Sequence, residues 1–180
     1  MPDIPGYRMT PAGGPAIRTD IIDVFVFKRS AASPPGHHDA IFLQVLRASE
    51  PLSNTWHPVM GHIEKGENAA ACALRELEEE LGLGRADPAL LGLWALEQVH
   101  PFYIAAIDTI VMSPRFAAEV ATDWQPRLND EHTATRWVAA SQISSMFMWP
   151  GQIAACREII EHLLPKDSLS RTALRISTER

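Results

Sequence analysis

Three glutamates near the end of one predicted helix are the residues of this sequence best suited to chemistry. They are Glu76, Glu79 and Glu80, and at about 100° per residue their side chains fall within about 100° of one another. Like charges at this spacing destabilise an exposed helix, and they also oppose its dipole. A divalent cation would reverse both penalties, and carboxylates are ligands that Mg²⁺ or Mn²⁺ prefers. The spacing indicates a metal site, or else a solvated acidic face on which Arg75 pairs with Glu79.

The helix that carries these acids is predicted from Asn68 to Leu81. Its apolar residues recur at helical spacing on a face separate from the acids, and they are Ala70, Leu74, Leu77 and Leu81. Asn68 is suited to cap the first turn, and Gly82 is suited to the left-handed conformation that ends a helix.

A longer motif surrounds the acids. Its order is Gly, five residues, Glu, seven residues, Arg-Glu, an apolar residue, any residue, Glu-Glu, any residue, Gly and an apolar residue. It is met by Gly61, Glu67, Arg75, Glu76, Leu77, Glu79, Glu80, Gly82 and Leu83. The segment resembles an intact Nudix box, so the chain is identified as a member of the Nudix hydrolase family. This resemblance implies an α/β fold, a Nudix-type α/β/α sandwich with a central mixed sheet.

The resemblance also implies roles for the motif residues. The acids that would bind the metal are Glu76, Glu79 and Glu80. Arg75 would orient one of them, and Glu67 would support the loop before the helix. Gly61 would bring its backbone close to the metal, and Gly82 would end the helix sharply.

A weaker resemblance extends beyond the motif, over roughly residues 20–164. Segments 56–61 (WHPVMG) and 131–138 (EHTATRWV), together with Trp149, are similar to dihydroneopterin triphosphate pyrophosphatases and dATP pyrophosphohydrolases. In that subgroup an acid before a His is a further metal ligand, and Glu131 matches it. The implied reaction is hydrolysis of a diphosphate linkage by metal-activated water, with a nucleoside or pterin triphosphate as the favoured substrate. Glu79 or Glu80 would accept the proton of the water, with Glu131 next.

Substrate contacts are expected outside the motif. Arg47, at the end of a predicted strand, is the preferred group for the phosphates, and Trp94 or Tyr103 could stack on a base. Other substrates remain open, including ADP-ribose, dinucleoside polyphosphates, coenzyme A and oxidised nucleotides. A Nudix-fold module that senses a nucleotide without cutting it is the alternative from another class.

The elements that must position these residues alternate along the chain, which predicts one layered α/β domain over 19–165. A flexible arm (1–18) precedes it and a polar, frayed tail (166–180) follows. Strands are expected at 19–29, 40–47, 56–60, 90–98, 103–112 and 133–139, and helices at 141–148 and 151–164. Residues 30–39 form a turn-rich insert, and 114–129 are expected to be irregular with a helical turn at 116–120.

The composition of the chain limits the classes of partner that it can be expected to bind. With 180 residues and a net charge of −6, the chain is unsuited to holding a nucleic-acid backbone by bulk electrostatics. No apolar run is long enough for a membrane span and the first residues do not form a signal peptide, so a cytoplasmic protein is expected. A small-molecule nucleoside diphosphate-type substrate is the expected partner. A homodimer is a further expectation, drawn from the family alone.

Overall fold

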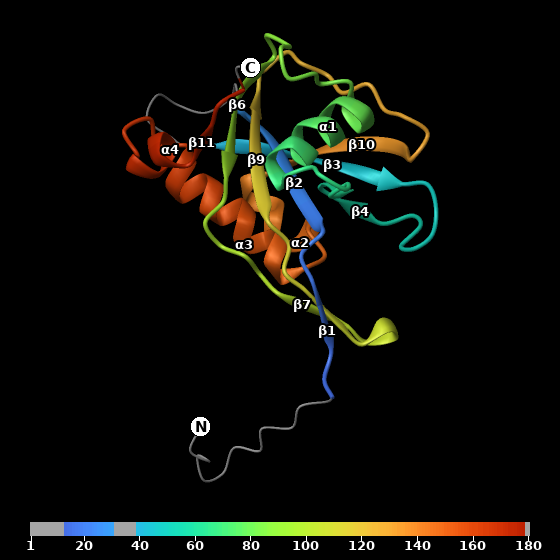
Figure 1. The fold of residues 1–180 in the computed structure, drawn as a ribbon. Helices are drawn as coiled ribbons and strands as arrows, with labels where there is room; N and C mark the ends of the chain where they lie inside the picture. The colour runs from blue at the N-terminus through green and yellow to red at the C-terminus, as the bar shows by residue number, and fades with distance from the viewer. Residues whose placement is uncertain (1–12, 31–38, 179–180) are drawn as a thin grey trace, which may run out of the picture.

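The computed structural model describes residues 13–30 and 39–178. The predicted insert at 30–39 and the predicted arm at 1–18 therefore lie largely outside the described residues. Within them the chain forms a large mixed sheet with helices on both of its faces, and a small sheet that projects from this body (Figure 1).

The large sheet runs in the order β10-β3-β2-β9-β6-β11. Its strands are β2 (Ile21–Arg29), β3 (Ala40–Arg47), β4 (Trp56–His57), β5 (Val59–His62), β6 (Leu90–Ala95), β9 (Arg115–Val120), β10 (His132–Ala139) and β11 (Arg175–Ile176). Strand β2 is parallel to β9 and antiparallel to β3, which makes the sheet mixed. Strand β4 pairs with β3 and β5 pairs with β2, so the 56–62 segment joins the sheet between these two strands.

Each face of this sheet has its own hydrophobic core. Helix α1 (Ala69–Leu81) covers one face and forms the α1-side core, which contains Val24, Val26, Leu74 and Leu77. Helices α2 (Ile143–Met146) and α3 (Pro150–Glu158), with a π-helical continuation (Ile159–Leu163), cover the other face. They form the α3-side core, which contains Phe25, Phe27, Trp94 and Cys156. Because successive residues of β2 alternate between the cores, both faces are buried, and the predicted α/β/α sandwich is confirmed.

One strand of the centre was not predicted. Residues 116–120 were expected to form a helical turn, but they belong to β9, in which all six residues are buried. Strand β9 pairs with β2 on one side and with β6 on the other. The run Phe-Ala-Ala-Glu has no strong strand propensity, so burial and pairing on both sides decide its conformation.

The C-terminal segment is also more ordered than expected. Instead of a frayed tail, it forms α4 (Leu169–Ala173) and β11, and β11 pairs with β6 to become the edge strand of the large sheet. The Arg171 guanidinium lies 4.5 Å from the ring centre of Trp94 and forms an ion pair with the buried Glu119. These contacts fasten the segment to the α3-side core.

The small sheet has the order β1-β8-β7 and points away from the body (Figure 1). Its strands are β1 (Ala16–Arg18), β7 (Phe102–Ile104) and β8 (Thr109–Val111). The strand expected over 103–112 is thus two short strands, with a 3₁₀ turn at Ala105–Ile107 between them. Within the described ranges, no helix combines the length and the apolar character needed to cross a membrane.

Candidate active site

Helix α1 begins and ends where the sequence predicted. The side chain of Asn68 accepts a hydrogen bond of 2.9 Å from the N–H of Ala71, which caps the first turn. Gly82 has φ of 68°, and its N–H donates to the carbonyl of Glu78. A left-handed residue here ends the helix at once, directly after the acids.

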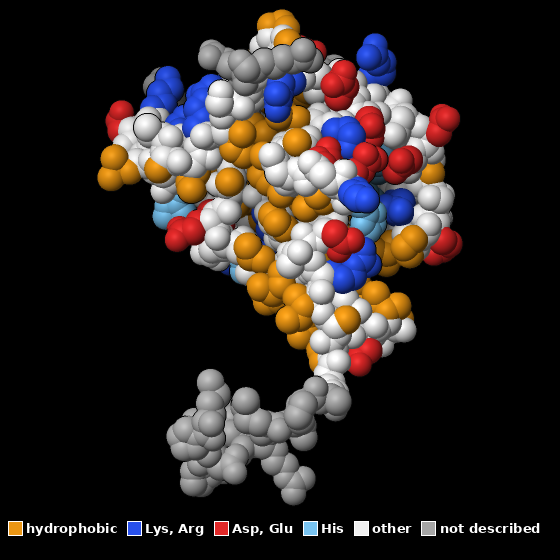
Figure 2. Space-filling model, viewed as in Figure 1, with side chains coloured by type: hydrophobic (Ala, Val, Ile, Leu, Met, Phe, Trp, Pro, Cys, Tyr) orange, Lys and Arg blue, Asp and Glu red, His pale blue; other side chains and the backbone are white. Residues whose placement is uncertain are grey.

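The apolar face of α1 fixes the position of the acids. Leu74, Leu77 and Leu81 are buried in the α1-side core, as expected. The acids lie along the boundary of this face: Glu80 is only 2% exposed, Glu76 is 8% exposed, and the side chain of Glu79 is 54% exposed. Figure 2 shows acidic and basic side chains gathered over α1. Two carboxyl groups are therefore held against the protein while the third reaches solvent.

Arg75 connects three of the four acids of the motif. Its guanidinium donates two bonds of 3.1 Å to Glu67, one of 2.8 Å to Glu76 and one of 2.9 Å to Glu79. It also donates to the carbonyl of His62 in the preceding loop. The bonds to Glu67 raise the pKa of Arg75 and lower the pKa of Glu67, so both groups are charged at neutral pH. Arg75 thus orients more acids than the one that the resemblance implied.

Gly61 lies directly against Glu76. An added Cβ at position 61 would lie 2.2 Å from Oε1 of Glu76, which is far below a normal contact. Gly61 is on β5, next to Ile22 of β2, so the approach is set by the sheet rather than by a loose loop. Only a residue without a side chain allows the carboxyl group of Glu76 to occupy this place.

Glu80 lies apart from the contacts of Arg75. Burial, and then the nearby charges of Glu76 and Glu131, raise its pKa to about 9. Burial also raises the pKa of Glu76, although Arg75 opposes this effect. Without a cation, the protein therefore disfavours a full set of ionised carboxylates here.

Two histidines lie behind Glu80. The Nε2 atom of His132 is 3.8 Å from Oε2 of Glu80, and the rings of His57 and His132 are 5.4 Å apart. Burial, and then the neighbouring His57 and Arg47, lower the pKa of His132 to about 4, so its imidazole is neutral at pH 7. Sequence reasoning assigned these histidines no role, because a strand pattern does not show which way His132 points.

Glu131 and Arg47 also lie at this end of the helix. Glu131 precedes β10, its carbonyl accepts a bond from the N–H of Ala48, and its charge acts on Glu76 and Glu80. Arg47 ends β3 and pairs in register with His132, and its positive charge acts on Glu80. The structure thus gathers Arg47 and Glu131 with the motif acids, although they are far apart in sequence.

The acids suit a divalent cation chemically, but they are not yet arranged around one. Among the described residues, no three His, Cys, Asp or Glu side chains form a ready cluster for a metal ion. The guanidinium of Arg75 occupies the space between Glu76 and Glu79 instead. A cation that bound here would have to draw these two carboxylates away from Arg75. The hard oxygen donors, the bare backbone at Gly61 and the unbonded Oε2 atom of Glu80 fit such a cation.

Two predicted substrate contacts lie elsewhere. Trp94 is fully buried in the α3-side core, and its indole N–H donates to the carbonyl of Arg171. Tyr103 is on β7 in the projecting sheet, where its hydroxyl donates to Asp108. The structure does not bring either ring to the acids. For Trp94, full burial on the opposite face of the sheet rules out stacking on a ligand held at α1, so that prediction is wrong.

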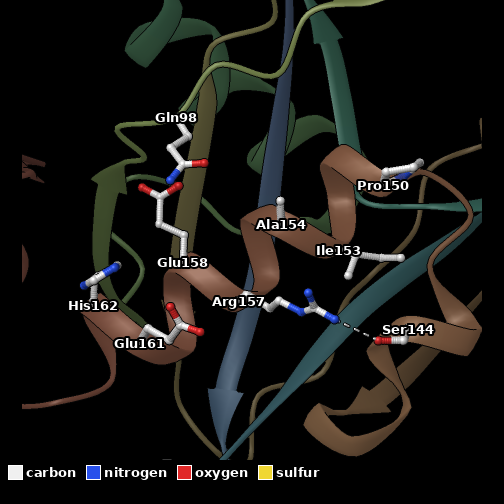
Figure 3. A pocket seen from close by; sticks show the side chains of 9 residues that line it. All are labelled: Gln98, Ser144, Pro150, Ile153, Ala154, Arg157, Glu158, Glu161 and His162. Carbon is white, nitrogen blue, oxygen red and sulfur yellow. Dashed lines mark hydrogen bonds between the residues drawn. The ribbon is translucent and has the colours of Figure 1, made fainter.

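A groove of about 480 Å³ lies along α3, on the face opposite to α1 (Figure 3). None of its lining residues belongs to the motif. Two of its charged side chains already have partners within the chain: Arg157 donates to the hydroxyl of Ser144, and Glu158 accepts from the N–H of Glu97. The groove therefore contributes nothing to the acidic site.

Known proteins are similar to this chain in sequence or in fold. The asymmetrical bis(5′-nucleosyl)-tetraphosphatase of Sus scrofa is 27% identical, over 75% of this chain and 88% of that protein. An octanoyltransferase of Myxococcus xanthus is 31% identical over 68% of this chain, which spans only 36% of that protein. The solved dihydroneopterin triphosphate pyrophosphohydrolase of E. coli superposes with a TM-score of 0.61 at 19% identity, covering 78% of this chain and 94% of that one.

The family model named NUDIX domain matches residues 22–159. This range includes the whole motif, all of β2 except its first residue, and the elements from β3 to α3. It lies within the range 19–165 expected for the domain, and it ends before α4 and β11. The chain belongs to the Nudix family.

Proposed function

We propose that this protein uses Mg²⁺ or Mn²⁺ to hydrolyse a diphosphate linkage in a nucleotide-like substrate. Membership of the Nudix family identifies it as a pyrophosphohydrolase, as the sequence predicted. The observation that carries the finer proposal is the packing of Glu76 against the bare backbone of Gly61, with Glu79, Glu80 and Glu131 around it. A purely structural acidic helix face would need no such close approach.

The groups that would hold the cation are the carboxylates of Glu76, Glu79 and Glu80, with Glu131 and the backbone of Gly61 in support. When bound, the cation would neutralise phosphate charge and lower the pKa of a water molecule. Arg75 would keep Glu67 as its partner and stay beside the site as a fixed positive charge. Arg47 is the cationic side chain of β3 at this end of the helix, and it would bind the phosphates.

Glu79 is our preferred proton acceptor for the attacking water. Its side chain is the most exposed of the three box acids, and the Arg75 guanidinium fixes one of its oxygens at 2.9 Å. Glu80 is buried and better placed to hold a cation than to meet solvent water. Glu131 is exposed as well and is the second candidate.

Two substrate classes have support. The subgroup resemblance and the E. coli structure favour a nucleoside or pterin triphosphate. The similarity to the Sus scrofa tetraphosphatase, which extends over most of that enzyme, favours a dinucleoside polyphosphate as the second candidate. ADP-ribose is the third class, retained from the sequence.

One experiment separates these classes. The purified protein is incubated with Mg²⁺ or Mn²⁺ and a panel of triphosphates, dinucleoside polyphosphates and ADP-ribose, and the products are separated by anion exchange. Pyrophosphate release identifies a triphosphate substrate, while two monophosphate products indicate an ADP-ribose-like linkage. Glu79→Gln and excess EDTA are the controls. Binding without turnover of any compound would reject the enzyme in favour of a sensing module. Sedimentation of the same sample tests the expected homodimer.

A further inference from the structure

Glu80 is the motif acid that Arg75 does not hold. The guanidinium of Arg75 contacts Glu67, Glu76 and Glu79. Glu80 is buried, and its Oε2 atom accepts no hydrogen bond within the described part of the chain. Something other than Arg75 must therefore set the orientation of this carboxyl group.

His132 is the side chain placed to do so. Strand β10 has a shift in its pairing with β3 between His132 and Ala134, which is the sign of a β-bulge. Bulges turn a side chain away from the regular alternation of a strand. Here the side chain of His132 is 1% exposed and faces Glu80, while the next residue, Thr133, is exposed.

The ring of His57 packs against that of His132, with ring centres 5.4 Å apart. Its Nδ1 atom is 2.7 Å from the carbonyl oxygen of Pro58, so this nitrogen carries the proton and donates it. The Nε2 atom of His57 is then an acceptor in the interior. It has no partner among the described residues, and neither does Nδ1 of His132.

Neighbouring side chains of His57, Glu80 and His132 thus each have one buried polar atom with no partner in the described part of the chain. Buried polar atoms are normally paired, and apolar residues would fill this space at lower cost. Packing alone does not account for two histidines here. A role toward Glu80 does, because metal-binding carboxylates are commonly oriented by hydrogen bonds from a second layer of residues.

We propose that His132 is the positioning residue of Glu80 and turns its carboxylate toward the divalent cation. This inference rests on the proposed function, in which Glu80 is a ligand. Arg75 and His132 differ in how they would act on a bound metal. Arg75 is bonded to Glu76 and Glu79 and competes with the metal for them. His132 lies 3.8 Å from Glu80, beyond hydrogen-bond length, and would become its donor when the carboxylate turns toward the cation.

The test measures Mn²⁺ binding to the full chain by electron paramagnetic resonance, without substrate. His132→Leu fills a similar volume but has no donor, while His132→Gln keeps an N–H near the place of Nε2. Thr133→Ala, on the exposed side of the same bulge, is the matched control. We expect His132→Leu to weaken Mn²⁺ binding by about 10- to 100-fold. His132→Gln should recover part of this loss, and Thr133→Ala should leave binding unchanged.

Circular dichroism establishes that each variant is folded, and a folded variant is required for each Mn²⁺ measurement. Equal Mn²⁺ affinity in His132→Leu and the wild type would overturn the positioning role. So would a His132→Gln protein that binds as weakly as His132→Leu. If the wild type itself bound no Mn²⁺, the metal site of the proposed function would be rejected, and this role with it.

Discussion

Substitution of Gly61 by alanine should damage the site while leaving the fold intact. A Cβ at position 61 would lie 2.2 Å from Oε1 of Glu76, and ordinary contact begins near 3.4 Å. The carboxyl group would thus have to retreat by about 1.2 Å, the difference between these distances. A displacement of about 1 Å in a catalytic group costs on the order of 100-fold in rate. We therefore expect kcat/KM to fall by about 100-fold, equivalent to about 2.7 kcal/mol of transition-state stabilisation.

Stability should change little, because the group that moves is the end of a flexible side chain. Mild overpacking costs about 1 kcal/mol, which lowers Tm by roughly 2–4 °C in a chain of this size. The assay combines steady-state hydrolysis of the substrate identified by the panel with Mn²⁺ binding and thermal unfolding. Gly84→Ala is the control, since its Cβ would lie 3.7 Å from the nearest atom of Glu78. A Gly61→Ala enzyme with kcat/KM within threefold of the wild type would refute the reasoning.

Further predictions concern the charges of the site and the C-terminal segment. Glu79→Gln and Glu80→Gln should keep the circular dichroism spectrum but lose about 10²-fold or more in kcat; near-normal turnover in both would remove the mechanism. In EDTA, folded Glu80 holds its proton up to a pKa of about 9, against 4.5 when unfolded. The free energy of unfolding should therefore fall as pH rises between these values, and Glu80→Gln should flatten this slope; equal slopes in chemical denaturation would contradict it. Arg75→Ala should lower Tm without metal, and saturating Mn²⁺ should restore Tm by more than it raises that of the wild type, because the cation replaces the guanidinium between the acids. Equal shifts would argue against such replacement. Removal of residues 166–180 should expose the β6 edge and lower Tm by several degrees, as measured by calorimetry; an unchanged Tm would show that the segment contributes nothing.

The sequence correctly predicted the elements whose conformation depends on residues close together in the chain. Helix α1 is defined by its apolar spacing, by the cap at Asn68 and by Gly82, and the structure has all three. Strands β2 and β3 were readable from their β-branched and aromatic residues. Strand β9 was not, because pairing on both sides gives Ala117 and Ala118 a conformation that their own propensities do not favour.

The candidate site likewise contains residues whose positions follow from local sequence and residues whose positions depend on the folded sheet. The motif placed its acids and Arg75 correctly on one helix, since they are separated by only a few residues. Arg47 is brought to them by β3, and this agrees with the prediction for a strand end. Trp94 was misjudged because sequence alone does not show which face of β6 it occupies. The inward turn of His132 depends on a bulge, which leaves no mark in the residue pattern.

The two separate cores allow the protein to be altered on one side without disturbing the other. The acids stand on the α1-side core, while Phe147, Cys156 and Ile159 fill the α3-side core across the sheet. Changes of volume at these three positions should shift the melting temperature and leave cation affinity as it was. Substitutions in α3, natural or engineered, could therefore change the thermal stability of this protein without changing its catalytic site.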